Sequence, residues 1–231
     1  MKVCGELRFF EPRPILPRDK LMSAQIVREP RWPAVVAMLA AGCVYWSLPE
    51  PLSIGPGWLL LAVILVLTIP LVISNHRGQF NIARILTFTA NGAITIAMIA
   101  SLAFLIHGIP QHRDPPQTLL RAAAALWVTN VLVFALWYWK LDAGGPLKRE
   151  TARGRVDSSF LFPQMLSQEC ADESWSPRFM DYLFLAFNTS TAFSPTDTAV
   201  LSRWAKAGMM VQSLISLTVV ALLAARAVNV L

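Results

Sequence analysis

Five apolar runs divide the chain, separated by stretches rich in proline, glycine or charge. They cover residues 33–48, 58–73, 85–106, 119–139 and 204–231. A helix needs about 20 predominantly apolar residues to cross a hydrocarbon core of about 30 Å. Prolines and glycines in the intervening loops end each helix. The pattern therefore predicts an all-α membrane protein with five transmembrane helices.

A sixth segment, residues 179–198, is apolar only over residues 182–187, which is too short to cross a bilayer. A hydroxyl- and amide-rich run follows, immediately before the last apolar run. Non-helical backbone survives at membrane depth only where protein buries it or where it lines water. We therefore expect a re-entrant, pore-like hairpin here, with candidate pore or filter residues Asn188, Thr189, Thr191, Ser194, Thr196 and Asp197.

The same pattern divides the chain into four parts. These are a basic tail (1–32), a four-helix transmembrane region (33–140), a polar linker (141–178), and the hairpin with the last helix (179–231). Composition agrees, because only 15% of residues are charged and 55% are hydrophobic, against about 25% charged in soluble domains. The lipid bilayer is the first expected partner.

Basic residues are distributed unevenly among the loops. With a cytoplasmic N-terminus, the tail, the loop 74–84 and the region 140–206 hold 7, 2 and 8 basic residues, or 17 of the 20. Cytoplasmic loops of membrane proteins carry this excess. The sequence therefore predicts a multi-pass plasma-membrane protein with its N-terminus in the cytoplasm. Membrane flanks explain the positive charge better than a nucleic-acid partner does, so no nucleic-acid partner is expected.

The stretch 181–197 with the helix after it resembles the pore helix, filter and inner helix of tetrameric potassium-channel-type proteins. The stretches 139–146 and 160–164 are typical of a group of uncharacterised bacterial integral-membrane proteins that carry such a hairpin, and the chain is similar to them over residues 85–231. This second resemblance brings no function with it. The first implies a homo-tetramer that passes a small inorganic ion.

The channel resemblance is incomplete in the filter. Thr191 matches the threonine that opens a potassium filter, and Asp197 matches the acidic residue that closes it. Between them the chain has no glycine and carries Pro195, whereas a ladder of inward carbonyls needs backbone angles that glycine adopts most readily. The run is also one residue longer, and the charge pattern places the hairpin on the inner face instead of the outer one.

Several polar positions have two interpretations. The run 179–198 is either a re-entrant hairpin or an interfacial helix followed by a turn in which Ser202 caps the last helix. The stripe Gly208, Gln212 and Ser216 lines an aqueous path or packs helices together. Asn91 and Asn130 form side-chain amide hydrogen bonds between helices, or they contact a substrate or an ion. A second stripe of small residues, predicted to allow close helix packing, comprises Thr89, Ala93, Ala97 and Ser101.

No catalytic, cofactor-binding or metal-binding group is recognisable. Cys4, Cys43 and Cys170 are far apart, and the three histidines lack the spacing of metal ligands. We expect no enzyme and no cofactor. Two functions remain: a channel-like protein with a glycine-free filter, or a non-conducting membrane scaffold that assembles with a partner.

Overall fold

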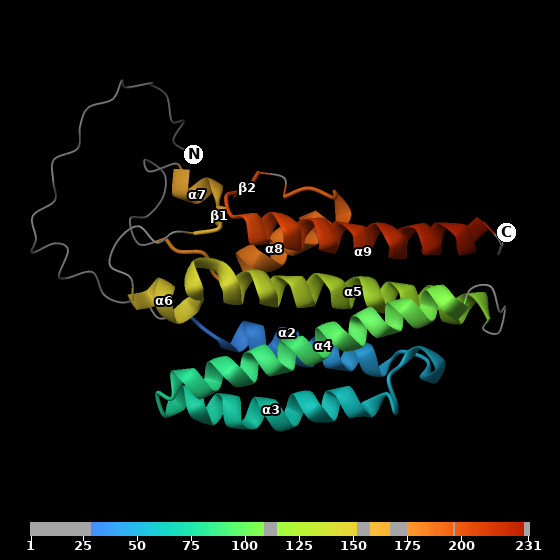
Figure 1. Cartoon of the computed structure of the whole chain (residues 1–231), viewed down its shortest axis with the longest axis horizontal. Coiled ribbons are helices and arrows are strands. Elements are labelled where there is room, and N and C mark those ends of the chain that lie inside the picture. The colour runs from blue at the N-terminus through green and yellow to red at the C-terminus, as the bar shows by residue number, and fades with distance from the viewer. Residues whose placement is uncertain (1–28, 109–114, 152–157, 167–174, 196, 229–231) are drawn as a thin grey trace, which may run out of the picture.

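The computed structural model describes residues 29–108, 115–151, 158–166, 175–195 and 197–228. Long helices run side by side along the molecule, and a two-stranded sheet with short helices lies at one end (Figure 1). The elements are α2 (Trp32–Trp46), η1 (Glu50–Leu52), α3 (Trp58–His76), α4 (Phe80–Gly108), α5 (Pro116–Leu141), η3 (Asp142–Gly144), α6 (Pro146–Thr151), β1 (Phe160–Leu161), α7 (Pro163–Leu166), α8 (Phe179–Thr191), β2 (Ala199–Val200) and α9 (Arg203–Val228).

Helix α5 occupies the centre of the bundle. It lies between α8 and α9 on one side and α2 and α4 on the other, with α3 outermost (Figure 1). Within its most apolar stretch 61% of residues are buried, against 39% for α4 and 22% for α9. Polar side chains on α5 must therefore find their partners on neighbouring helices, because an unpaired buried polar group is costly.

Three helices are long and apolar enough to cross a membrane, within Phe80–His107, Gln117–Arg149 and Arg203–Ala225. Two further apolar helices, Trp32–Trp46 and Trp58–Ser74, are shorter. Helix α2 has 15 residues, which at the usual rise per residue is about 22 Å. The prediction of a predominantly helical fold is confirmed, and three helices have the length and composition to cross a membrane. The count of five spans stays a prediction.

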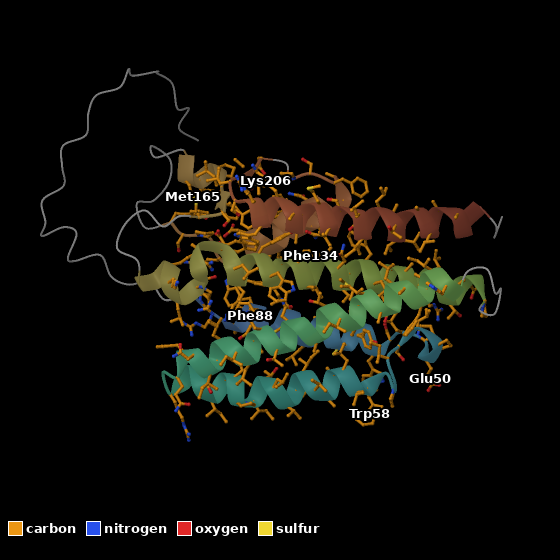
Figure 2. The ribbon with its side chains drawn as sticks, viewed as in Figure 1. Glu50, Trp58, Phe88, Phe134, Met165 and Lys206 are labelled. Carbon is orange, nitrogen blue, oxygen red and sulfur yellow. The ribbon has the colours of Figure 1, made fainter. Side chains whose placement is uncertain are left out.

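The sheet end of the bundle, where β1, β2, α6 and α7 lie, packs against the ends of the long helices. Strand β1 pairs antiparallel with β2, with Phe160 opposite Val200. The ring of Phe160 is fully buried and lies 5.2 Å from that of Tyr138, 6.2 Å from that of Tyr182 and 5.9 Å from that of Trp204, between ring centroids. The described parts of the polar linker therefore cover the ends of α5, α8 and α9. Glu50 and Trp58 lie toward the opposite end of the molecule from Met165 (Figure 2).

A tight turn joins α5 to α6. Ala143 has a φ of 52° and Gly145 a φ of 96°. A Cβ atom on Gly145 would lie 2.9 Å from the carbonyl oxygen of Lys140, so this position requires glycine both for its backbone angle and for space. The turn returns the chain against the end of α5 and places Asp142 in the interior, where its exposed fraction is 0%.

Two sequence predictions concern helix packing and capping. The Ser202 Oγ atom accepts a hydrogen bond from the Ala205 N–H at 3.4 Å, so Ser202 caps α9, as one of the two sequence interpretations expects. In the small-residue stripe of α4, Ala97 and Ser101 are buried, and the Ser101 hydroxyl bonds to that of Tyr45 on α2 at 3.4 Å. Thr89 is exposed, so only part of that stripe packs against a neighbour in the chain.

Candidate functional site

Gln212 on α9 is the centre of a polar contact between three helices. Its side chain is fully buried. Its Nε2 atom donates to the Ala186 carbonyl and to the Ser190 hydroxyl on α8, each at 2.8 Å. Its Oε1 atom accepts from the Tyr138 hydroxyl on α5 at 2.7 Å. Both Nε2 donors and the acceptor oxygen are therefore engaged inside one chain.

One turn further along α9, Ser216 continues this contact. It is also fully buried, and its hydroxyl accepts from the Asn130 Nδ2 atom on α5 at 2.8 Å. The same Nδ2 atom lies 3.3 Å from the carbonyl oxygen of Gln212. Asn130 thus bonds between helices, which was one of the two sequence interpretations. Interhelical bonds of this kind are worth about 0.6 kcal/mol each in membranes.

The stripe of α9 that begins at Gly208 faces the protein interior. A Cβ atom on Gly208 would lie 3.5 Å from the Tyr138 ring, so the stripe as a whole lies against α5 and α8. The opposite face of α9 is apolar and exposed, with exposed fractions of 67% at Met210, 62% at Leu214 and 51% at Leu217. In this arrangement the polar stripe packs helices together, and α9 presents hydrocarbon to its surroundings.

The candidate filter residues divide between α8 and the loop after it. Helix α8 continues through Asn188 to Thr191. The Thr189 and Thr191 hydroxyls bond to carbonyls four residues earlier, at 2.8 and 2.9 Å, which is a usual arrangement for hydroxyls within a helix. Thr189 is 1% exposed, whereas Thr191 is exposed. The first half of the hydroxyl-rich run is therefore helix, not an open carbonyl ladder.

The loop after α8 returns to the sheet end and enters β2. Phe193 has a φ of 53°, a left-handed conformation that costs non-glycine residues roughly 1–2 kcal/mol. Ser194 and Pro195 are half-buried and Asp197 is exposed, while Thr196 lies outside the described residues. The structure thus brings Thr191 and Asp197 to the surface and separates them from the buried Thr189, Gln212 and Ser216.

A second polar cluster, around the buried carboxylate of Asp142, was not identified from the sequence. Its Oδ2 atom accepts from the Tyr182 hydroxyl at 2.6 Å and from the Ser158 hydroxyl at 2.9 Å, and its Oδ1 atom accepts from the Ser159 N–H. One carboxylate thus joins the end of α5 to α8 and to the segment that leads into β1. Burial raises the pKa of Tyr182 well above its usual value, so the phenol remains a donor across the ordinary pH range.

Arg149 on α6 adjoins that cluster. Its guanidinium donates to the carbonyls of Trp139 and Asp142, each at 3.0 Å, and pairs with the Glu29 carboxylate at 3.1 Å. Both side chains are at least 93% buried, with exposed fractions of 7% and 5%. The Glu29 carboxylate also accepts from the Trp139 indole N–H. The pair therefore ties residues before α2 to the last turn of α5.

The sequence carried a weak signal for this cluster. Asp142 and Arg149 border the glycine-containing turn that ends the fourth apolar run, but charged residues beside a membrane helix are ordinarily solvated flanks. Only the fold shows that the turn buries them.

Histidines and acidic residues form no metal site in the described part of the chain. The His107 Nδ1 atom lies 3.0 Å from the Ala103 carbonyl oxygen, and the described residues hold no group of three or more histidine, cysteine or acidic residues suited to a metal.

Comparison of the chain with models of known protein families, with curated proteins and with solved structures finds no match.

Proposed function

We propose that the protein is a non-conducting, multi-pass membrane scaffold that assembles with partners in the bilayer. In this proposal α2, α3, α4, α5 and α9 span the membrane, and α8 is a closed re-entrant helix. The observation that carries it is the saturation of Gln212, whose polar atoms all bond to α5 and α8 within the chain.

The distribution of charge supports the orientation with a cytoplasmic N-terminus. The helices alternate in direction, so the sheet end gathers the start of α2, α4 and α9 and the end of α3 and α5 (Figure 1). Nine described basic residues lie at that end: Arg31, Arg77, Arg84, Lys140, Lys148, Arg149, Arg178, Arg203 and Lys206. The positive-inside rule then assigns the sheet end to the cytoplasm.

The position of α8 supports a re-entrant helix. Near its start the Phe179 ring lies 6.0 Å from that of Trp139 at the sheet end, and further along Phe187 lies 5.8 Å from Trp127. Ser190 meets Gln212, which is nine residues beyond the start of α9. Nine residues correspond to about 14 Å of helix, or nearly half of a typical hydrocarbon core. The loop after α8 then returns to β2.

A conducting path needs polar groups that contact water or ions. The polar side chains of α9 beside α8, Gln212 and Ser216, are buried and bonded to protein atoms. The exposed face of α9 is apolar, with Met210 and Leu214 among its most exposed residues. Such a surface suits lipid or an apolar partner helix, and it is the surface through which the scaffold would assemble.

The proposal predicts no protein-dependent current in planar bilayers. Purified wild type, Asp197→Asn and Thr191→Val should all give the baseline of protein-free membranes, because the polar stripe of α9 is buried and bonded to protein atoms. A cation current in wild type that Asp197→Asn lowers would contradict the scaffold function, since a carboxylate at a pore mouth attracts cations at short range.

That contrary result would support the second candidate, a channel-like oligomer. Helix α8 packs against both α5 and α9, as a pore helix packs against outer and inner helices, and Thr191 and Asp197 are exposed near its end. A channel of this type would require several copies, a tetramer by the resemblance, because one hairpin cannot enclose a pore.

The proposed orientation is testable with two single cysteines in a background without Cys4, Cys43 and Cys170. Glu50 and Arg178 are both exposed. Glu50 lies at the end of the bundle opposite the sheet (Figure 2), and Arg178 precedes α8, whose first residue packs against Trp139 at the sheet end. In intact cells, an impermeant thiol reagent should label Glu50→Cys and leave Arg178→Cys unmodified until the cells are opened. The reverse labelling pattern would overturn the orientation.

A further inference from the structure

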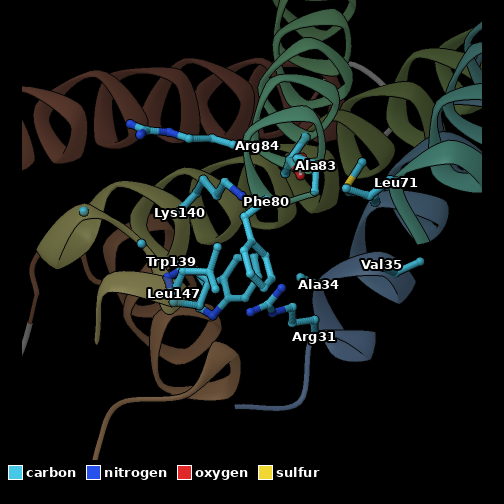
Figure 3. A pocket seen from close by; sticks show the side chains of 15 residues that line it. Arg31, Ala34, Val35, Leu71, Phe80, Ala83, Arg84, Trp139, Lys140 and Leu147 are labelled. Carbon is cyan, nitrogen blue, oxygen red and sulfur yellow. Dashed lines mark hydrogen bonds between the residues drawn. The ribbon is translucent and has the colours of Figure 1, made fainter. Parts of the chain in front are cut away.

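A basic cavity opens at the sheet end between the first turns of α2 and α4 and the turn after α5 (Figure 3). Arg31, Arg84 and Lys140 line it, and no acidic residue is among the described residues around it. Its space for water-sized molecules is about 60 Å³, room for about four waters at roughly 15 Å³ each. A cavity of this size fits a small anionic group.

Aromatic rings hold the basic groups in position. The Arg31 guanidinium lies 5.6 Å from the centroid of the Phe80 ring, and the Lys140 ammonium lies 6.0 Å from that of Trp139. Figure 3 shows the Arg31 head group beside the Phe80 ring, while Arg84 extends away from it along the outside of the bundle. Cation–π contacts of this kind hold a cation in position.

The charges in this cluster repel one another. Arg31, Arg84 and Lys140 carry the same charge and line one cavity, and like charges held close together are unfavourable. Glu29 pairs with Arg149, and neither residue is among those that line the cavity. An anion beside Lys140 and Arg31 would be attracted by both groups and by the charge of Arg84 at the edge of the cavity, which is the usual basis of phosphate recognition by clustered basic side chains.

Part of the cavity wall is apolar. Ala34, Met38 and Leu71 belong to this wall, and all three are buried. The charged groups lie at the ends of α4 and α5, the level at which a span meets the membrane surface. Basic pockets between helices at this level bind the head groups of anionic lipids.

We propose that this cavity binds a phosphate-bearing anion beside Lys140 and Arg31, with Arg84 adding positive charge at its edge. The phosphate is supplied either by the head group of an anionic phospholipid or by a soluble phosphate, and both present the same oxygens. The site lies between α2, α4 and α5, away from the polar contact of α5, α8 and α9, so it does not depend on whether the protein conducts.

The test is native mass spectrometry of the full chain released from detergent with phosphatidylglycerol or with phosphatidylcholine. The wild type should retain phosphatidylglycerol in preference to phosphatidylcholine. The double variant Arg84→Gln/Lys140→Gln should lose this preference. Near a membrane surface each basic residue is worth about 1 kcal/mol, so removal of two corresponds to an apparent affinity lower by about 25-fold.

The matched control is Arg203→Gln/Lys206→Gln, which removes two exposed basic residues at the same end of the bundle. It should retain the lipid preference of wild type. Equal loss in both double variants, or no loss in either, would overturn the site, because general surface charge would then explain lipid binding. Arg84→Gln alone, at an exposed position, repeats the test should the double variant fail to fold.

A second arm separates the two sources of phosphate. Inorganic phosphate is titrated into the detergent-solubilised protein without lipid, and its effect on the thermal unfolding midpoint is compared in wild type and the double variant. Stabilisation of wild type alone, without a lipid preference, assigns a soluble phosphate; a lipid preference alone assigns a phospholipid. If wild type shows neither stabilisation by phosphate nor a lipid preference, the proposal is overturned.

Discussion

Asp142→Asn is expected to lower the free energy of unfolding by about 2–3 kcal/mol. The carboxylate is fully buried and accepts hydrogen bonds from the Tyr182 and Ser158 hydroxyls and the Ser159 N–H. An amide replaces one acceptor oxygen with a donor, so at least one of these buried donors then faces another donor. Leaving a buried polar group without its partner costs about 1–3 kcal/mol, and more for bonds to a charge.

The effect is measured as a shift of the thermal unfolding midpoint in detergent, followed by tryptophan fluorescence. Tyr182→Phe removes one donor and leaves the carboxylate with two, so it should cost about 1 kcal/mol. Glu50→Gln changes an exposed carboxylate at the other end of the bundle and should stay within about 0.5 kcal/mol of wild type. An Asp142→Asn shift no larger than that of Glu50→Gln would contradict the role assigned to the buried carboxylate.

Removal of either partner of the Glu29–Arg149 pair is expected to have the largest effect of any single change. Both side chains are at most 7% exposed, so Arg149→Met leaves a carboxylate buried without its cation. Breaking one side of a buried ion pair costs about 3–5 kcal/mol, whereas replacing both partners with apolar residues is often far less harmful. The double variant Glu29→Leu/Arg149→Met should therefore be more stable than the sum of the single variants predicts.

A double-mutant cycle measures this difference. The same thermal unfolding experiment is run on wild type, both single variants and the double variant, and we expect a coupling energy of about 1–3 kcal/mol. The Arg149 bonds to the Trp139 and Asp142 carbonyls are lost in the double variant as well, so full recovery is not expected. Strict additivity of the two single changes would show that the pair does not act as a buried ion pair.

The long helices could be predicted from the sequence because membrane length and helix breakers act locally. The apolar run 119–139 became α5 with bounds Pro116–Leu141, and the run 204–231 became α9, which begins at Arg203. The short elements of the linker could not be found in this way. Strand β1 exists because Phe160 packs against Tyr138, Tyr182 and Trp204, and these contacts join residues far apart in the chain.

In the candidate site, too, local patterns were predictable and contacts between distant residues were not. Periodicity placed Gln212 and Ser216 on one face of the last helix, and the structure places both in the interior. Whether that face meets water or protein depends on its partners. Ser190, Tyr138 and Asn130 belong to other helices, so no local pattern in the last helix could decide between an aqueous path and helix packing. Asp142 was missed because its burial results from the fold of the linker over the turn after α5.

The most direct test of the central claim, a closed contact between α5, α8 and α9, is the accessibility of position 216. Ser216→Cys is a small change at a fully buried position, introduced into a background without the natural cysteines. The reaction rate with a charged, water-soluble thiol reagent is measured on the protein in a bilayer from both sides, with Glu50→Cys as the exposed reference. The closed contact predicts no modification of Ser216→Cys while Glu50→Cys reacts completely. Modification at a rate comparable to that of Glu50→Cys would mean that water reaches the stripe, and would contradict the account.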